Sequence, residues 1–431
     1  MSVPDSDVWN AVETVDRSEL IAKQNAVLPE RIEKAYVEGG LYRKMYDAAG
    51  VSPGDYGSRA DLGRLPLVSK DMVRAFRAET GDPYGGLSSG VVPGASISHG
   101  SGTSGTPTLQ VSSPADRETV ADELASMFWM AGAREGTRIL TMQNFGVRVE
   151  LTLPLAAFKI GAVHILPDLG SASVDQLEFL RPEVTWAYPG WLDGLSAAAA
   201  KSGRKLDAVL DSLETLWWGG RYLSPLKRSR LQEQVGATIY EMGGMGDVGL
   251  HTSSCSAQDG MHIREDLFVV ETIDPDSGQP LTDGSPGELV FTSLWDEGMN
   301  HVRWRSDDIG MVKSEPCSCG RTSARIFQLG RVWERTVVDG VLVMPGQVDD
   351  ILYDVTEQDV PFQLVRSADG SRPAFLRVAV PSDGGVSVDD LGATVCSRLG
   401  VELEVRATTT EELVGSAGAK YAHKYAQVKD E

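Results

Sequence analysis

The sequence is short of several features that would place it in a specialised class of protein. Only 4 of its 431 residues are cysteine, which is too few for a disulfide scaffold. Lys and Arg number 40 against 61 Asp and Glu, so the formal net charge is −21. So acidic a chain repels phosphate backbones and anionic lipid, which argues against nucleic-acid and membrane partners.

Long apolar runs are also missing. The most apolar stretch, residues 151–166, is interrupted by Pro154 and Lys159 and is too short to cross a bilayer. The N-terminus has neither the basic region nor the apolar core of a secretory signal. We therefore expect a soluble, cytoplasmic protein. With 42% hydrophobic and 23% charged residues, the composition is that of a globular chain, and its length indicates two or more domains.

The pattern of apolar residues predicts an α/β fold. Short apolar runs alternate with helical stretches, which is typical of a largely parallel sheet. These runs are 139–142, 162–166, 184–188, 215–218 and 238–240. Before them, helical periodicity covers 18–49 and breaks at Gly39-Gly40. From 268 to 305 the pattern becomes β-rich. We place a domain boundary near Arg331, with a large domain over 1–330 and a small α+β domain over 331–431.

A stretch rich in glycine and small hydroxyl residues runs from His99 to Thr108. Such residues let a backbone wrap closely around an anion and offer it N–H and O–H donors. The spacing of its glycines mimics a Walker A loop, but Thr106-Pro107 stands where Lys-Ser/Thr is required, which excludes that motif. A flexible Gly/Ser linker is the alternative.

Three of the four cysteines and one histidine form a possible metal site. Thiolates and a neutral imidazole suit tetrahedral zinc, and four protein ligands would make the site structural. Reduced cysteines and a surface histidine explain the pattern equally well, because Cys-x-Cys is less typical of zinc than Cys-x-x-Cys. Cys396 lies outside the set and is expected in the core. The four residues are Cys255, His262, Cys317 and Cys319.

Two further segments carry polar chemistry. Asp307 and Asp308 end a strand-like stretch, where carboxylates can accept hydrogen bonds from sugar hydroxyls, although such a pair is often a solvated turn. The tail carries Lys420 and Lys424 after Gly418. A basic cluster in a terminal segment is usually solvated.

Taken in order, these segments resemble the adenylate-forming (AMP-binding) superfamily, and most closely the phenylacetate–CoA ligases, over nearly the whole chain. The resemblance implies a large adenylation domain followed by a small C-terminal domain that rotates about a hinge near Arg331. The matching segments are 65–71 at the entry, 100–108 as phosphate loop, 182–190 beside the acyl pocket, 219–222 as adenine turn, 303–308 at the ribose and 317–331 before the hinge.

The resemblance also implies roles for single residues. Lys420 would be the catalytic lysine, and the four-residue Cys/His set would hold a structural zinc, as in several members of the family. The acyl pocket would be lined by Phe145, Tyr188, Gly243 and Gly244, the glycines leaving room for a flat ring. The nucleotide would be bound by Ser101, Gly102, Thr103, Ser104, Gly105, Thr106, Gly220, Arg221, Tyr222, Tyr240, Asp308, Arg325 and Arg331.

The chain departs from the family pattern at several of these positions. Thr106 stands where the phosphate loop usually has lysine, and Arg221 where the adenine turn usually has glutamate. Gly244 holds the place of a glutamate that normally helps to bind Mg²⁺, with Glu241 and Asp247 nearby.

The tail departs as well, because Ala419 separates Gly418 from Lys420 and makes Lys424 a second candidate for the catalytic lysine.

The resemblance implies an enzyme that activates a carboxylic acid, aromatic or arylacetic, with ATP and Mg²⁺. The acid would attack the α-phosphate, and the acyl-adenylate would pass to CoA, giving acyl-CoA, AMP and pyrophosphate. Two alternatives stay open: an amide-forming ligase with an amine acceptor, and a non-catalytic descendant, which the residues at 106 and 244 favour. A homodimer is left open.

Overall fold

The structure is a computed structural model that divides into two compact units. Unit 1 comprises residues 1–187, 207–220 and 236–328, and unit 2 comprises 188–206, 221–235 and 329–431. Two internal segments therefore group with the C-terminal residues. The residues described are 8–88, 90–99, 108–141, 151–166, 174–187, 189–219, 222–357, 360–367, 372–379, 387–414 and 427–431.

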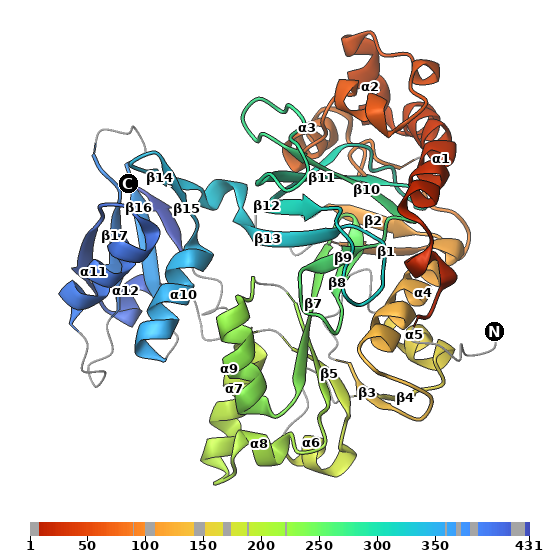
Figure 1. Ribbon diagram of the computed structural model, residues 1–431. Coiled ribbons are helices and arrows are strands. Elements are labelled where there is room, and N and C mark those ends of the chain that lie inside the picture. The colour runs from red at the N-terminus through yellow and green to blue at the C-terminus, as the bar shows by residue number, and fades with distance from the viewer. Residues whose placement is uncertain are drawn as a thin grey trace. The chain divides into compact units, whose positions relative to one another are not determined.

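Unit 1 is built on a mixed sheet of 11 strands in the order β10-β11-β12-β13-β9-β8-β7-β6-β5-β3-β4 (Figure 1). The strands from β4 to β7 pair in parallel, and β7 then pairs antiparallel with β8. Every residue of β6 is buried, as expected for a parallel strand covered on both faces. The mixed α/β class expected from the alternating apolar runs is confirmed.

The strands of this sheet are β3 (Arg138–Leu140), β4 (Val163–Ile165), β5 (Val184–Ala187), β6 (Thr215–Trp218), β7 (Thr238–Met245), β8 (Gly249–Ser254), β9 (Met261–Ile263), β10 (Phe268–Ile273), β11 (Gly287–Ser293), β12 (Trp304–Lys313) and β13 (Arg325–Arg331).

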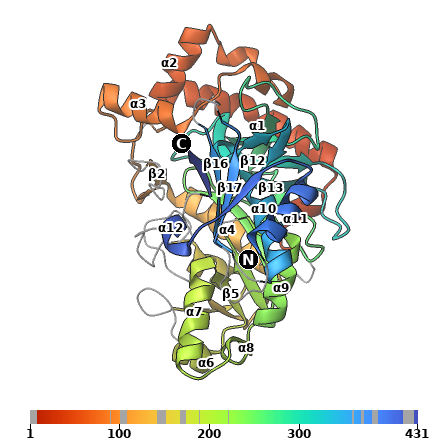
Figure 2. The same cartoon turned by 90° about the vertical axis from the view of Figure 1, so that its left-hand side faces the viewer.

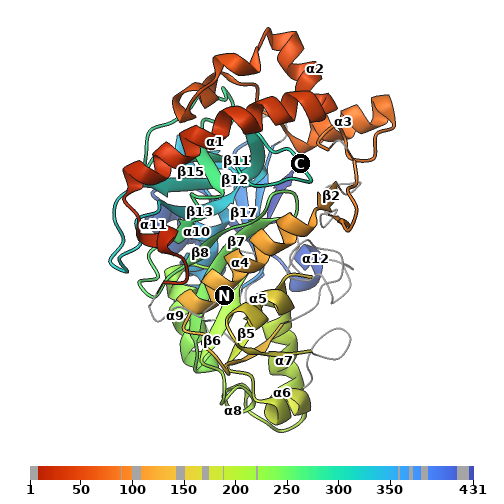
Figure 3. The ribbon, with the colours of Figure 1, turned by 90° about the vertical axis from the view of Figure 1, so that its right-hand side faces the viewer.

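Helices cover both halves of the sheet. Buried residues of α1 and α2 share a core with β9–β13, and α1 lies across the antiparallel half (Figure 3). The helices α4 and α5 share a second core with β3, β5, β6 and β7. The helices are α1 (Arg17–Glu38), α2 (Gly40–Ala49), α3 (Lys70–Thr80), α4 (Pro114–Met130), α5 (Leu153–Lys159), α6 (Val174–Leu180) and α8 (Leu206–Val209), with 3₁₀ turns η1 (Ala11–Thr14), η2 (Pro53–Asp55) and η3 (Arg59–Arg64).

The expected helix over 18–49 is two helices, broken at Gly39 as the sequence indicates. A Cβ at Gly39 would lie 2.6 Å from the carbonyl oxygen of Ala35, so only glycine fits this junction. A small antiparallel hairpin, β1 (Ser96–His99) and β2 (Leu109–Ser112), places His99 opposite Leu109. The two strands that flank the Gly/Ser-rich stretch in the sequence are therefore paired with each other.

Unit 2 contains a four-stranded sheet in the order β18-β17-β16-β19. Buried side chains of α10 and α11 form its core with these strands (Figure 2). Lys227 in α9 pairs with Asp349 in α10 at 2.7 Å. The elements are α7 (Pro189–Lys201), α9 (Pro225–Val235), η4 (Val332–Glu334), β14 (Thr336–Val338), β15 (Val341–Val343), α10 (Pro345–Thr356), β16 (Phe362–Arg366), β17 (Phe375–Val378), α11 (Val388–Leu399), β18 (Glu404–Ala407), α12 (Thr410–Val414) and β19 (Val428–Asp430).

Among the described residues, no helix is long and apolar enough to cross a membrane.

Candidate functional site

Several residues expected at the site lie outside the described residues, so their roles stay predictions. They are Ser101, Gly102, Thr103, Ser104, Gly105 and Thr106 of the Gly/Ser-rich loop, Phe145, Tyr188, Gly220, Arg221, Lys420 and Lys424.

A bulge in β12 presents Asp307 and Asp308. One residue of β11 separates Glu288 from Val290, whereas three residues of β12 separate their partners Ile309 and Arg305. Asp307 has a left-handed backbone, with φ of 63°, which is uncommon for a residue other than glycine. Bulges of this kind re-aim side chains, and backbone strain of this kind clusters at functional sites.

The two aspartates of the bulge have different surroundings. The Asp308 side chain is buried, and the Gln328 amide donates to its Oδ1 at 3.3 Å. Asp307 is half-exposed and lies 3.8 Å from the Lys70 ammonium. The Asp308 carboxylate is therefore held in place, and such a group can accept hydrogen bonds from hydroxyl groups. Its ribose role stays a prediction. Asp307 instead faces a cation.

Lys70 reaches this bulge because the chain before α3 pairs with β12. Val68 forms an isolated parallel bridge with Trp304, its N–H donating to the Arg303 carbonyl at 3.0 Å. Ser69 then caps α3, its hydroxyl accepting from the Met72 N–H at 3.4 Å. Lys70 is thus the first residue of a helix whose start is fixed against the sheet.

The end of the Gly/Ser-rich loop is tied to the β7–β8 turn. Thr108, directly after the loop, donates its hydroxyl hydrogen bond to the Asp247 carboxylate. Both residues are buried. The other oxygen of Asp247 lies 3.4 Å from the Lys70 ammonium. A lysine and a carboxylate therefore meet at the end of the loop.

Asp247 also changes the interpretation of Gly244. A Cβ at Gly243 would lie 2.3 Å from the Thr252 hydroxyl, and one at Gly244 would lie 3.1 Å from Leu250. These glycines therefore permit β7 to pack closely on β8. This packing is a sufficient reason for glycine at both positions, and their role in an acyl pocket stays a prediction. Asp247, one of the two carboxylates that lie near Gly244 in the sequence, is buried and contacts Thr108 and Lys70.

The other predicted nucleotide residues of unit 1 are held by protein contacts. Burial raises the pKa of the Tyr240 phenol, whose ring lies 5.4 Å from that of Trp217. The Arg325 guanidinium donates to the Asp259 carbonyl at 2.9 Å and to the Glu315 carbonyl at 3.3 Å. Arg325 thus ties two neighbouring turns together, a structural role that the motif comparison did not suggest.

In unit 2, Tyr222 lies so close to Gly346 that a Cβ there would be 2.7 Å from its ring. The Arg331 N–H donates to the Glu334 carboxylate at 2.8 Å and begins η4. Their nucleotide roles stay predictions.

The four predicted metal ligands come together in unit 1. Their ligand atoms all lie within 4.8 Å of one another. The Cys255 and Cys317 sulfurs are 3.7 Å apart, and the Cys319 sulfur lies 3.3 Å from Nε2 of His262. Zinc–sulfur bonds of about 2.3 Å in a tetrahedron place two sulfurs about 3.7 Å apart. The spacing of the donors therefore fits a tetrahedral ion.

Neighbouring groups orient these donors. Nδ1 of His262 lies 3.1 Å from the Ser323 hydroxyl, which turns Nε2 toward the sulfurs. The hydrogen bond with Cys255, together with that from His262, lowers the pKa of the Cys319 thiol, and the same bond raises the pKa of the Cys255 thiol. Without a metal, one proton is therefore shared within this pair. The sequence singled out the four predicted ligands, whereas Ser323 carried no signal in the sequence.

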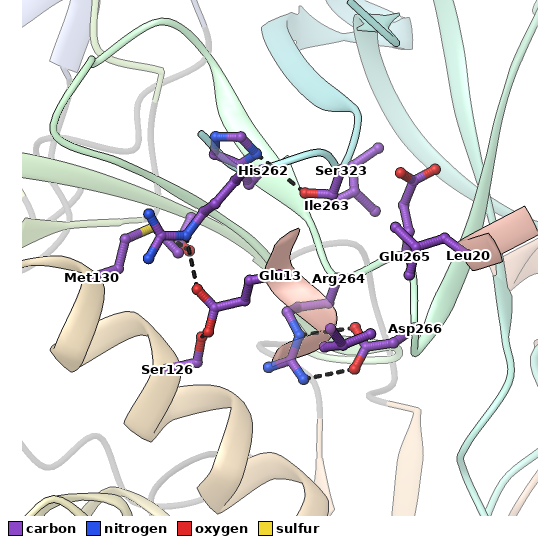
Figure 4. A pocket seen from close by; sticks show the side chains of 13 residues that line it. Glu13, Leu20, Ser126, Met130, His262, Ile263, Arg264, Glu265, Asp266 and Ser323 are labelled. Atoms are coloured by element: carbon purple, nitrogen blue, oxygen red, sulfur yellow. Dashed lines mark hydrogen bonds and ion pairs between the residues drawn. The ribbon is translucent and has the colours of Figure 1, made fainter. Parts of the chain in front are cut away.

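A small cavity beside His262 is lined in part by residues of the N-terminal segment, which hydrogen bonds hold in place (Figure 4). The Glu13 carboxylate accepts from the Ser126 hydroxyl at 2.9 Å and pairs with Arg321 at 2.8 Å. The Thr322 N–H donates to the Glu13 carbonyl at 3.2 Å. Because Arg321 and Thr322 follow Cys319 closely, η1 is held against the ligand-bearing loop.

Comparison with known proteins relates the chain to a group of ligases. No family model matches it. It is 29% identical over 368 residues to the phenylacetate-coenzyme A ligase of Thermus thermophilus, covering 84% of this chain and 81% of that protein. It is 28% identical over 348 residues to the phenylacetate-coenzyme A ligase of Aromatoleum evansii, covering 79% and 77%.

Solved structures support the fold. A 2-hydroxyisobutyryl-CoA ligase, in the postadenylation state with 2-HIB-AMP, matches with a TM-score of 0.84 at 20% identity. The match covers 100% of this chain and 94% of that one. At this identity the likeness establishes the fold alone.

Proposed function

We propose that this chain, which is similar to two phenylacetate-coenzyme A ligases, is an AMP-forming acid–thiol ligase of the adenylate-forming superfamily. It activates a carboxylic acid with ATP and transfers the acyl group to CoA. The observation that supports ATP handling most directly is the junction of Thr108, Asp247, Lys70 and the Asp307–Asp308 bulge within unit 1. Thr108, in the expected phosphate loop, contacts the buried Asp247 carboxylate. Lys70 contacts both Asp247 and Asp307, which lies in the expected ribose segment.

In the proposed reaction the acid attacks the α-phosphate of ATP, and pyrophosphate leaves. The chemistry asks the protein mainly to position two anions and to stabilise the charge that develops on the phosphates. Asp308 would accept hydrogen bonds from the ribose hydroxyls. Asp247 offers the oxygen ligand that Mg²⁺ prefers, and a bound Mg²⁺ would neutralise phosphate charge.

We propose that the acid is aromatic or arylacetic. The support is the sequence similarity to two phenylacetate-coenzyme A ligases across more than three quarters of each protein. The solved 2-hydroxyisobutyryl-CoA ligase, at 20% identity, acts on a small aliphatic acid and provides the natural contrast. A panel of acids must therefore contain both kinds.

We also propose that Cys255, His262, Cys317 and Cys319 hold one structural zinc ion. Three sulfurs and one imidazole nitrogen within 4.8 Å of one another support zinc over the harder cations. With four protein ligands, the ion would stabilise the loop before β13 and take no part in the reaction.

ATP–pyrophosphate exchange tests the proposed activity. The purified protein is assayed with phenylacetate, benzoate and 2-hydroxyisobutyrate, each with Mg²⁺ and without CoA. We expect acid-dependent exchange, fastest with an aromatic acid. The product is then followed with CoA, with hydroxylamine and with amino acids as acceptors, and thioester formation with CoA is the expected outcome. Exchange with 2-hydroxyisobutyrate alone would overturn the aromatic assignment, and no exchange with any acid would overturn the activity.

A further inference from the structure

A buried hydroxyl group holds the backbone of the β12 bulge. Leu289 is the one residue of β11 that lies opposite residues 306–308. The Ser306 side chain is fully buried there, and its hydroxyl donates to the Leu289 carbonyl at 2.7 Å. The same hydroxyl accepts from the Asp308 N–H at 2.9 Å. Ser306 therefore joins Asp308 to the neighbouring strand at the point where regular pairing is interrupted.

A second side chain holds the residue before Asp308. The Glu288 carboxylate, also fully buried, accepts from the Asp307 N–H at 3.3 Å and from Nε of Arg305 at 2.9 Å. Buried backbone donors must find acceptors, and in this bulge two side chains supply them. The left-handed conformation of Asp307 is therefore held from both sides.

The place of the Asp308 carboxylate depends on this backbone. The carboxylate stands two rotatable bonds from its own Cα, so a shift of the bulge moves it. The Gln328 amide donates to it at 3.3 Å, slightly longer than the usual range of about 2.7–3.2 Å. Groups that position a substrate lose much of their effect when they are displaced by about 1 Å.

We propose that Ser306 is a positioning residue of the nucleotide site, which fixes the Asp308 backbone and so directs the Asp308 carboxylate toward the ribose hydroxyls of ATP. The proposal rests on the proposed function, and Ser306 acts through Asp308 without contacting the nucleotide. Loss of the hydroxyl would leave the Leu289 carbonyl and the Asp308 N–H without this partner, so the bulge would rearrange to satisfy them.

The experiment compares ATP with 2′,3′-dideoxy-ATP, which keeps the base and the phosphates but lacks both ribose hydroxyls. Calorimetric titration of the full chain, without any acid, gives the two dissociation constants and their ratio. Ser306→Ala removes the hydroxyl, and Ser306→Thr keeps it. Asp308→Ala is measured alone and together with Ser306→Ala. If Ser306→Ala does not fold, Ser306→Cys, which is close to serine in size and forms weaker hydrogen bonds, takes its place.

The matched control is Thr292→Val. The Thr292 hydroxyl is also buried and accepts from the Arg303 N–H at 3.1 Å. Its removal therefore costs a hydrogen bond between β11 and the residue just before β12, outside the bulge. Thermal melting of each variant monitors folding.

We expect the unchanged protein to bind ATP on the order of tenfold more tightly than dideoxy-ATP, because hydrogen bonds to a carboxylate are lost with the hydroxyls. In Ser306→Ala this ratio should fall on the order of fivefold, through weaker binding of ATP alone. Ser306→Thr and Thr292→Val should keep the ratio. In Asp308→Ala the ratio should be lost, and adding Ser306→Ala should weaken ATP binding no further.

Equal loss of affinity for both nucleotides in Ser306→Ala, or an unchanged ratio in the folded variant, would overturn the proposal and leave Ser306 a purely structural role. A ratio lowered as much by Thr292→Val would overturn it too. If the unchanged protein binds both nucleotides equally well, the ribose role of Asp308 fails and the proposal fails with it, while ATP binding stands. If it binds neither, the proposed function itself fails.

Discussion

At the scale of single residues, the core of unit 1 contains a buried imidazole, that of His251, whose protonation would destabilise the folded protein. The His251 ring lies 4.3 Å from that of Phe291 and 6.2 Å from that of Phe268. Neither ring nitrogen has a hydrogen-bond partner among the described residues. Burial lowers the pKa of His251 from 6.5 to about 3, so the folded protein keeps this ring neutral.

The pKa of His251 predicts a pH dependence of stability. Below pH 6.5 the unfolded chain binds a proton at His251, whereas the folded protein binds this proton only below about pH 3. Stability from this group is therefore full above pH 6.5 and is lost as the pH falls, by about 1.4 kcal/mol per unit. Urea unfolding gives the free energy of unfolding at pH 7.5 and at pH 4.5. Its decrease between these two pH values should be about 2.5 kcal/mol smaller in His251→Leu than in the unchanged protein. Equal losses in both proteins would contradict the assignment.

The four predicted metal ligands stand out more clearly in the sequence than the predicted nucleotide residues do. Cysteine is rare in this sequence, and Cys317 and Cys319 are separated by one residue, so chemistry alone singled them out. Asp247 is one of many acidic residues, and only the fold shows that it is buried beside Thr108. The guanidinium of Arg325 donates to the carbonyls of Asp259 and Glu315, contacts that its position in the sequence does not indicate, and its nucleotide role stays a prediction.

At the scale of elements, the loop between β12 and β13 has little regular structure to hold it. Cys317 and Cys319, in its middle, lie beside Cys255 and His262, and the proposed zinc ion would join the four residues. Arg321 and Thr322 fasten its end to η1 through Glu13. The metal ligands and the N-terminal turn are therefore successive supports of the same loop, and loss of the first should weaken the second.

Removal of the metal should loosen both the loop and η1. Bound zinc contributes about 10 kcal/mol in small zinc peptides, so losing even part of this should lower the melting temperature on the order of 10 °C. Amide hydrogen exchange of residues 8–16 and 315–324 should rise in Cys317→Ser and after treatment with 1,10-phenanthroline. Exchange in β16 and β17 should not change.

Two controls accompany this measurement. Cys396→Ser removes the half-buried cysteine outside the metal set, and the non-chelating isomer 1,7-phenanthroline controls for the aromatic additive. Less than half an equivalent of zinc in the purified protein, with Cys317→Ser as stable as the unchanged chain, would contradict the metal site.

The elements that depend on local pattern were predicted well. Short apolar runs predicted β3 to β7, and Gly39 predicted the break between α1 and α2. The bulge of β12 was not predicted. It arises from the way in which β12 pairs with β11, and the pattern of a single strand does not show this pairing. The bridge from Val68 to Trp304 joins residues far apart in the chain, so no local signal marks it.

At the scale of the whole molecule, the chain divides where the sequence only partly indicates. The last change of unit lies at 328–329, and the boundary near Arg331 between a large and a small domain stays a prediction. The grouping of 188–206 and 221–235 with the C-terminal residues was not expected. It rests on contacts such as the pair between Lys227 and Asp349, and tertiary contacts of this kind leave no trace in local composition.

The C-terminal tail carries the residue that we expect to serve the first half-reaction, the formation of the acyl-adenylate. Residues around the β12 bulge belong to unit 1, and the C-terminal tail belongs to unit 2. We propose that Lys420 in that tail bridges the acid and the α-phosphate during adenylation only, since a compact ammonium suits two anions that approach each other. Lys420→Ala should then slow ATP–pyrophosphate exchange on the order of a hundredfold, at an unchanged melting temperature.

Transfer from preformed acyl-adenylate to CoA should be much less affected by Lys420→Ala, because the lysine serves only the first half-reaction. Lys424→Ala is the matched control, four residues further along the same tail, and should slow neither step appreciably. The reverse pattern would move the role to Lys424. If neither substitution slowed exchange in a protein that adenylates, this tail would supply no lysine to the first step, and the assignment of the C-terminal domain would be wrong.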